Sequence, residues 1–256
     1  LERDVMTLLG AHKQHKETLL AALGQLADLA GTLGMKTLKS DLERTRIPKL
    51  TDERFHVVVL GEFNRGKSSF VNALLGADVL PTGVTPTTAT INHVGWGEKA
   101  SAHAVLKSEA RERVPIESLA EWVTVQGAKI DSVQHVEISY PAELLKDGIF
   151  LIDTPGVNDL NDQRAEITYG YVPRADAVLF LLDAGQVLTE SERAFLATRV
   201  LDRSRDRLVF VLNKCDLLSD EEQVEAVAYA RKHLARLVDG PPLFAVSAKK
   251  KSGFAP

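Results

Sequence analysis

Residues 61–69, which read G-E-F-N-R-G-K-S-S, match the pattern G-x-x-x-x-G-K-[ST]. The apolar run at 55–60 is typical of a buried strand, and residues 70–75 carry apolar side chains at helical spacing. A strand that turns through glycine into a helix points backbone N–H groups at one spot, which favours a polyphosphate. We therefore expect Lys67 to reach the β- and γ-phosphates and the Ser68 hydroxyl to hold Mg²⁺. The other residues of this phosphate loop are Gly61, Glu62, Asn64, Arg65, Gly66 and Ser69.

A second motif would act on the same metal and phosphate. Asp153 follows an apolar run at 149–152 and begins the sequence D-T-P-G. At the carboxyl end of a strand, its carboxylate can reach Mg²⁺ through water, and the Gly156 N–H can bond the γ-phosphate. The motif is short and carries weight because of its place after a buried strand and a phosphate loop.

A threonine-rich loop separates these two motifs, with five threonines among residues 82–90. Such a loop can present a hydroxyl and a carbonyl to Mg²⁺, ordering with the triphosphate and relaxing after hydrolysis. Thr88 is best placed relative to the strand expected at 90–94, with Thr87 and Thr85 as alternatives. A cluster of β-favouring threonines at a strand start is the plainer interpretation.

A third motif, N-K-x-D, follows the apolar run at 208–212 and indicates the base. Asp216 can accept two hydrogen bonds from N1–H and the exocyclic amine of guanine, a donor pair that adenine lacks. Asn213 would brace the loop and Lys214 would lie along the base, whereas Cys215 is incidental. The backbone of the loop Ser247, Ala248 and Lys249 can contact the guanine O6.

The elements that must position these motifs alternate between strand and helix, which predicts a doubly wound, mainly parallel α/β sheet with its ligand at the carboxyl edge. Strands are expected at 55–60, 90–94, 133–140, 149–152, 177–182, 208–212 and 243–246, and helices at 70–75, 189–200 and 220–237. Residues 97–132 are polar, and we expect them to be irregular apart from a helix at 116–125.

An N-terminal helical segment at 1–50 is expected to precede the nucleotide domain at 51–256. Apolar residues spaced by three and four predict an amphipathic helix that Gly31 and Gly34 weaken or end, and a second helix at 36–46 would end before Pro48. Its apolar stripe could pack on the same domain, in a helical bundle, or on another chain. Because the first residue is Leu, we expect the chain to begin inside a longer protein.

The composition limits the class of protein. The net charge is 31 − 35 = −4, so the overall charge does not indicate a nucleic-acid-binding surface. A single cysteine excludes a disulfide framework and fits a reducing compartment. The sequence contains no run of about 18 apolar residues, so it predicts no membrane-spanning helix.

The motifs together, in the order G-x-x-x-x-G-K-S, D-T-P-G, N-K-x-D and S-A-K, resemble those of a P-loop GTPase over residues 54–249. Within that class the chain is similar to the bacterial dynamin-like proteins. Three features carry this resemblance: Ser68-Ser69 followed by F-V-N-A-L-L-G, the first-switch segment at 80–90, and the 85-residue spacing from Ser68 to Asp153, filled by an insertion at 97–148. The resemblance implies a C-terminally truncated GTPase-domain fragment whose closing helix, neck and trunk are absent.

The resemblance also implies a function. We expect Mg²⁺-dependent hydrolysis of GTP to GDP, coupled through dimerisation across the nucleotide face to membrane remodelling by absent regions. The protein would be cytoplasmic and peripheral at the inner face of a membrane. Its partners would be a second copy of itself or a second dynamin-like protein, with no nucleic acid. The alternative is a GTPase of ribosome assembly or RNA modification; the negative charge, the insertion and the N-terminal helix favour the first interpretation.

The catalytic residues implied are Lys67, Thr88 and Gly156, joined by two sources of positive charge. Asn64 would help to hold K⁺ or Na⁺ beside the phosphates. Arg65 would supply charge directly, in cis or across a dimer, unless it is a solvated surface arginine. Val157 stands where many small GTPases carry a water-orienting Gln. The water would instead be placed by a carbonyl of the 85–88 segment, by Asn158 or Asp159, or by a partner's loop.

Overall fold

The computed structural model describes residues 2–51, 54–83, 88–124, 127, 129–146, 148–156 and 170–254, with side chains from residue 16 onward, excepting Lys49 and Arg203. The chain divides into two compact units, Leu1–Arg54 and Phe55–Pro256. Within the described ranges, no helix combines the length and apolar composition that a membrane span requires.

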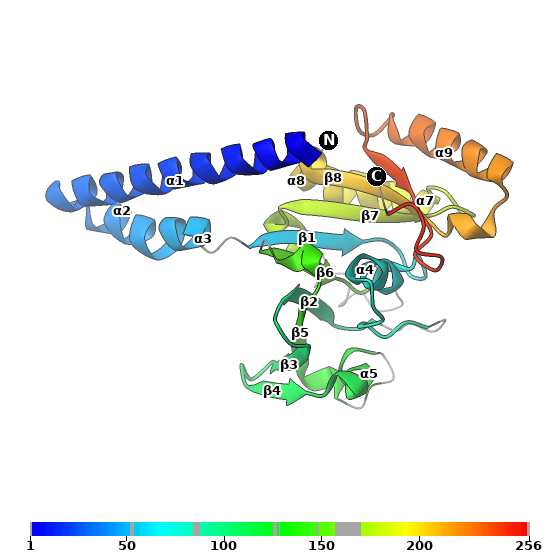
Figure 1. The fold of residues 1–256 in the computed structure, drawn as a ribbon, viewed down its shortest axis with the longest axis horizontal. Helices are drawn as coiled ribbons and strands as arrows, with labels where there is room; N and C mark the ends of the chain where they lie inside the picture. Colours follow the sequence, from blue (N-terminus) through cyan, green and yellow to red (C-terminus); the bar gives the residue numbers. More distant parts are fainter. Residues whose placement is uncertain are drawn as a thin grey trace. The chain divides into compact units, whose positions relative to one another are not determined.

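The first unit is helical (Figure 1). It contains α1 (Glu2–Thr32), α2 (Lys36–Asp41), a π-helical turn (Leu42–Arg46) and α3 (Ile47–Thr51). Gly34, with a φ of 70°, lies in the turn after α1. The prediction that the second helical piece ends before Pro48 is wrong. The Ile47 N–H bonds the Leu42 carbonyl in the π-turn, and Pro48 then falls in the first turn of α3, where its missing N–H costs little.

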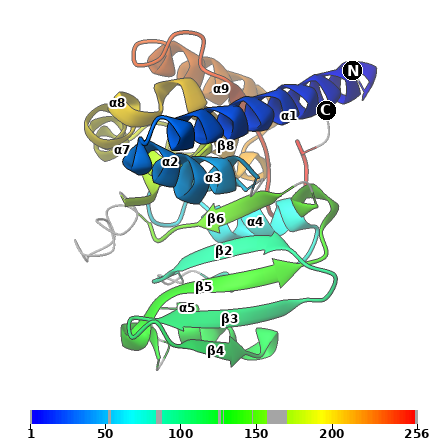
Figure 2. The same ribbon diagram turned by 90° about the vertical axis from the view of Figure 1, so that its left-hand side faces the viewer.

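The second unit contains, within the residues described, one sheet with the strand order β4-β3-β5-β2-β6-β1-β7-β8-β9. Figure 2 shows the part of this sheet from β4 to β6. The strands are β1 (Phe55–Leu60), β2 (Ile91–Trp96), β3 (Ser101–Leu106), β4 (Arg111–Val114), β5 (Val133–Tyr140), β6 (Ile149–Asp153), β7 (Ala177–Asp183), β8 (Leu208–Asn213) and β9 (Leu243–Ala245). The pairs β6–β1, β1–β7, β7–β8, β8–β9 and β2–β5 are parallel. This confirms the mainly parallel α/β class.

Two of these strands correct the prediction for residues 97–132. Strands β3 and β4 form an antiparallel hairpin there, and β3 pairs antiparallel with β5. Ala102 and Ala104 are the inward residues of β3, opposite Ile138 and Val136, and both are fully buried. Small apolar residues on a short strand give a weak alternation signal, and β4 is an edge strand rich in charge. Both features hid the hairpin from sequence reasoning.

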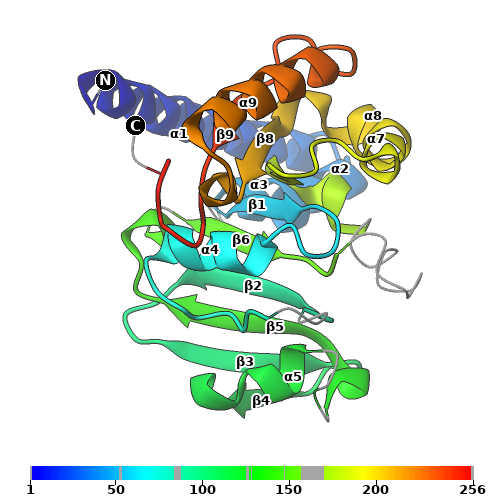
Figure 3. The same ribbon diagram turned by 90° about the vertical axis from the view of Figure 1, so that its right-hand side faces the viewer.

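Helices cover both faces of the sheet. On one face α4 (Lys67–Leu75) and α5 (Ala120–Val123) pack against the strands (Figure 3). On the other face lie α7 (Glu190–Phe195), a π-turn (Leu196–Val200), α8 (Leu201–Ser204) and α9 (Asp220–Leu234). Short 3-10 turns occur at Ile116–Ser118, Ile130–Ser132, Glu143–Leu145, Val172–Arg174, Arg205–Arg207 and Cys215–Leu217.

The core divides into two layers because successive residues of a strand face opposite sides. Phe180 and Leu182 of β7 belong to one buried cluster, and Leu181 between them belongs to the other. Both clusters are held by strands whose carboxyl ends carry the sequence motifs. The sheet therefore gives those motifs a rigid common edge.

Candidate nucleotide-binding site

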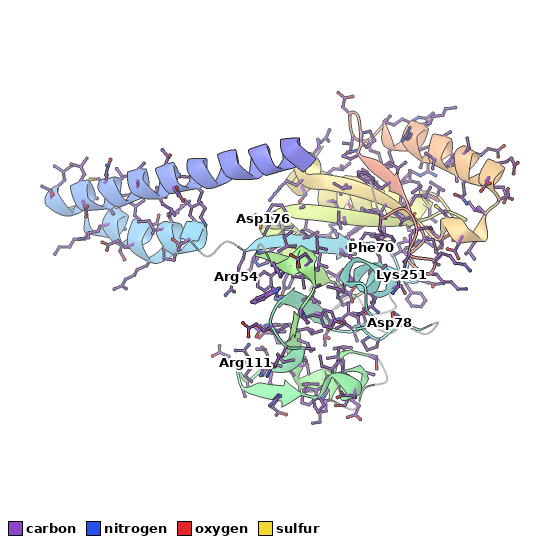
Figure 4. All side chains as sticks on the ribbon, in the orientation of Figure 1. Arg54, Phe70, Asp78, Arg111, Asp176 and Lys251 are labelled. Atoms are coloured by element: carbon purple, nitrogen blue, oxygen red, sulfur yellow. The ribbon has the colours of Figure 1, made fainter. Side chains whose placement is uncertain are left out.

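A cavity of about 660 Å³ brings residues of all four motifs together. The predicted residues that line it are Asn64, Gly66, Lys67, Ser68, Ser69, Thr88, Gly156, Asn213, Lys214, Asp216, Ala248 and Lys249. Gly61, Glu62, Arg65, Asp153 and Ser247 are not among its lining residues. The lining also includes residues that sequence reasoning missed, among them Asp78 and Lys251, which Figure 4 labels.

The phosphate loop takes the backbone shape that its glycines allow. Asn64 and Gly66 are left-handed, with φ values of 59° and 79°. A Cβ on Gly66 would lie 2.6 Å from the Asn213 Nδ2, so only glycine fits there. The Lys67 ammonium donates to the carbonyls of Gly61 and Glu62, at 2.9 Å each, which draws the side chain over the loop. The first turn of α4 lines the cavity, as a phosphate site at a helix N-terminus requires.

Three oxygen-bearing side chains meet at the place expected for Mg²⁺. The Ser68 Oγ donates to the Asp153 Oδ2 at 2.9 Å and lies 2.9 Å from the Thr88 Oγ1. The Thr88 Oγ1 is 3.5 Å from the same Asp153 oxygen. Hard oxygen ligands of this kind suit Mg²⁺. Thr85 and Thr87 lie outside the described residues.

The surroundings of the Asp153 carboxylate favour a bound cation. It is fully buried, and its Oδ1 has no hydrogen-bond partner among the described residues. Burial raises the pKa of the Asp153 carboxyl above its ordinary value, opposed by the charge of Lys67. The Asn92 Nδ2 donates to the Oδ2 at 3.3 Å, a contact that the sequence alone did not indicate. A divalent cation nearby would offset the burial of this charge, so the residues fit Mg²⁺.

The D-T-P-G turn lies directly against the phosphate loop. A Cβ on Gly156 would come within 2.9 Å of the Phe63 backbone, and the Thr154 hydroxyl donates to the Val59 carbonyl at 2.8 Å. The close approach to Phe63 places Gly156 beside the backbone of the phosphate loop. Val157, Asn158 and Asp159 lie outside the described residues.

The base-recognition motif is tied to the phosphate loop through Asn213. Its Nδ2 donates to the Arg65 carbonyl and its Oδ1 accepts from the Ala248 N–H, both at 3.0 Å. The Ser247 hydroxyl donates to the Asp216 Oδ1 at 2.5 Å, which orients that carboxylate. Lys214 lies 2.8 Å from the Asp183 Oδ2. The side chain of Cys215 is buried. Through Asn213, the phosphate loop and the guanine loop therefore form one hydrogen-bonded assembly.

Arg65 is not a solvated surface residue, so that interpretation is wrong. It is only 7% exposed, and its guanidinium contacts Glu62, Asp183 and Glu192. Its carbonyl accepts the Asn213 bond, while its side chain is directed at carboxylates. Asp183 and Glu192 are functional candidates that sequence reasoning missed, because no motif contains them.

Comparison with known proteins identifies a family to which this chain is similar. Residues 57–215 match the sequence model of the Dynamin family. The chain is 26% identical to "Dynamin-like protein A" of Bacillus subtilis and 30% identical to "Bacterial dynamin-like protein" of Nostoc punctiforme, over 88% and 82% of its length. It is also 31% identical, over 80% of its length, to an uncharacterised Caldicellulosiruptor protein.

The chain spans only part of these relatives: 25% of the Bacillus protein, 33% of the Nostoc protein and 51% of the Caldicellulosiruptor protein. A solved structure described as an oligomerised bacterial dynamin pair superposes with a TM-score of 0.61 at 26% identity. That superposition covers 93% of this chain and 40% of the other. The similarity therefore extends beyond the motifs to most of the chain described here.

Proposed function

The chain belongs to the dynamin family, and from this premise we propose that it binds GTP with Mg²⁺ and hydrolyses it to GDP and phosphate. The observation that carries the proposal has two parts. Ser68, Thr88 and Asp153 meet beside the phosphate loop, and Asn213 of the N-K-x-D motif bonds the carbonyl of Arg65 in that same loop. One side of the assembly suits a metal-bound polyphosphate and the other suits guanine. A chance phosphate-loop match would not produce both on one cavity.

The residues would divide the work of positioning and charge neutralisation, which is most of phosphoryl-transfer catalysis. The loop N–H groups and Lys67 would hold the β- and γ-phosphates. Ser68 and Thr88 would ligate Mg²⁺, with Asp153 bound through water, and the cation would neutralise charge between the phosphates. The Gly156 N–H would bond the γ-phosphate.

The base end would select guanine through Asp216. Its carboxylate would accept from the guanine N1–H and exocyclic amine, held in place by the Ser247 hydroxyl. Lys214 would lie along the base, and the Ala248 and Lys249 backbone would reach the O6. Adenine has no donor pair at these positions, so it would leave the carboxylate unpaired at a cost of about 1–3 kcal/mol.

Asn64 lines the cavity beside the phosphate loop, and we extend the proposal to a K⁺ or Na⁺ held there. The cation would supply the positive charge that Arg65, occupied by carboxylates, is not free to bring to the phosphates. Equal GTP turnover in K⁺ and in a large cation such as tetramethylammonium would refute this role.

For the whole protein we propose self-association of this domain and action on a membrane. The superposed bacterial dynamin pair is described as oligomerised and as sensing and tethering membranes. Dimerisation would make turnover per molecule rise with protein concentration. Flat turnover together with salt-sensitive RNA binding would instead favour the alternative of a ribosome-assembly or RNA-modifying GTPase.

A change of base specificity tests the site directly. Asp216→Asn replaces an acceptor by an amide that can donate, so GTP turnover should fall and xanthosine triphosphate, whose C2 carries a carbonyl, should become a substrate. Glu221→Gln on the exposed first turn of α9 removes the same charge nearby and should change neither. Loss of GTP turnover without any gain for xanthosine triphosphate in a folded variant would contradict the assignment.

A further inference from the structure

A buried group of charges joins two residues of the phosphate loop to carboxylates that lie outside the four motifs. We call Arg65, Glu62, Asp183 and Glu192 the charge cluster. Each guanidinium nitrogen of Arg65 faces a different carboxylate: the Nε lies 2.7 Å from Glu192, the Nη2 3.1 Å from Glu62 and the Nη1 3.8 Å from Asp183. The Arg65 side chain is 8% exposed and that of Glu192 is 0% exposed.

The charge cluster is costly for the folded protein. Its three carboxylates face Arg65, and Lys214 adds a second cation at 2.8 Å from Asp183, so the local charge is −3 + 2 = −1. Burial raises the pKa of Glu192, opposed by the charge of Arg65. Buried ion pairs rarely add net stability compared with apolar packing. A role other than stability therefore explains the cluster better.

The four members of the charge cluster come from three parts of the domain. Glu62 and Arg65 belong to the phosphate loop, Asp183 ends β7, and Glu192 lies in α7. Glu192 is itself held, because its Oε2 accepts from the Thr189 N–H in the capping box that begins the helix. The cluster thus connects the phosphate loop to the rigid body of the domain.

The same cluster reaches the base end of the site. Asp183 holds the Lys214 ammonium, and the Arg65 carbonyl accepts from the Asn213 Nδ2. A shift of Arg65 would therefore disturb the contacts of both Lys214 and Asn213, which belong to the guanine loop. Side-chain and backbone contacts of one residue join the two ends of the cavity.

We propose that Arg65 is a positioning residue, and that the charge cluster holds the phosphate loop and the guanine loop at a fixed separation. The inference rests on the proposed nucleotide function. It differs from a role for Arg65 in neutralising phosphate charge, because all three nitrogens of its guanidinium are directed at carboxylates. A planar guanidinium can direct its donors at three carboxylates at once, and the compact ammonium of lysine cannot reproduce that arrangement.

The test compares equilibrium affinities for GDP and for IDP, which lacks the exocyclic amine of guanine. Calorimetric titration of the wild type, Arg65→Met, Arg65→Lys and Glu192→Gln gives both dissociation constants. Glu190→Gln is the matched control: it removes the same charge from the exposed side of the same helix. Glu192→Gln keeps an oxygen for the α7 cap, since Gln also serves in a capping box.

We expect Arg65→Met and Arg65→Lys to weaken GDP binding at least tenfold, and Glu192→Gln to weaken it about threefold to tenfold. The preference for GDP over IDP should fall in all three, because the guanine loop loses its support. At saturating GTP, turnover should change less than KM. Glu190→Gln should leave both constants within twofold of the wild type.

Two results would overturn the inference. One is a loss of turnover in Arg65→Met with unchanged GDP affinity, which would place Arg65 in the chemical step. The other is Glu192→Gln matching Glu190→Gln in both affinity and base preference. Should Arg65→Met not fold, as thermal unfolding would show, the comparison of Glu192→Gln with Glu190→Gln decides the question. A wild type that binds neither nucleotide would refute the proposed function instead.

Discussion

Replacing Asn213 by alanine would separate the phosphate loop from the guanine loop. The side chain is 1% exposed and joins the Arg65 carbonyl to the Ala248 N–H at 3.0 Å on each side. Alanine removes both bonds and leaves one donor and one acceptor without their partner. No other described side chain bonds both of these backbone groups.

The magnitude follows from these two contacts. Each hydrogen bond contributes about 0.5–1.5 kcal/mol net, and a buried group left unpaired costs about 1–3 kcal/mol unless water from the cavity reaches it. A combined loss of about 2–4 kcal/mol is therefore expected. If the loops must be joined for binding, GDP affinity falls by about 30-fold to 1000-fold.

Asn213→Asp and Asn72→Ala make the experiment specific. Aspartate still accepts from the Ala248 N–H but has no amide to donate to Arg65, so an intermediate loss is expected. Asn72 makes three similar bonds to the backbone of Val79 and Leu80, beyond the end of α4. Asn72→Ala should destabilise the fold comparably while keeping the preference for GDP over IDP.

The assay is calorimetric titration with GDP and IDP, accompanied by thermal unfolding of each variant without nucleotide. The reasoning predicts that Asn213→Ala lowers the preference for GDP over IDP more than Asn72→Ala does. Equal preferences in both variants, at equal loss of stability, would show that Asn213 acts only on the fold.

Three further outcomes follow from the same structure. Burial raises the pKa of Asp153, so the stability that its protonation contributes is lost as pH rises through the pKa of the folded state. Without Mg²⁺, Asp153→Asn should therefore have a higher melting temperature than the wild type at pH 8. A lower melting temperature at that pH would contradict this reasoning. Gly156→Ala places a methyl group within 2.9 Å of the Phe63 backbone and should cost about 1–3 kcal/mol by denaturant unfolding, with GTP turnover reduced. Burial and the neighbouring His135 and His56 lower the pKa of His93 to about 3, so the free energy of unfolding falls as pH drops from about 6.5 toward that value. In acid titrations, His93→Phe should reduce the dependence of this free energy on pH by up to about 1.4 kcal/mol per pH unit. An unchanged dependence on pH would exclude His93 as its source.

The sequence predicted that the phosphate and guanine motifs meet at one edge of the sheet, and residues of both motifs line one cavity. Each motif could be recognised because it consists of contiguous residues. A glycine before Lys67 and Ser68, between an apolar run and a helix, needs no distant information to indicate a phosphate site. The alternation of apolar runs with amphipathic segments likewise predicted a mainly parallel sheet. The β3–β4 hairpin was missed because two alanines carry its buried face.

Only the tertiary structure showed what surrounds the Arg65 side chain. In the sequence it is one charged residue in a glycine-flanked loop, and a surface position or a place beside the phosphates is equally consistent with that pattern. Its partners Asp183 and Glu192 are 118 and 127 residues away, and no local pattern connects them to it. Parallel strands bring their carboxyl ends to one edge, and this long-range packing turns separate motifs into a single site with a buried support.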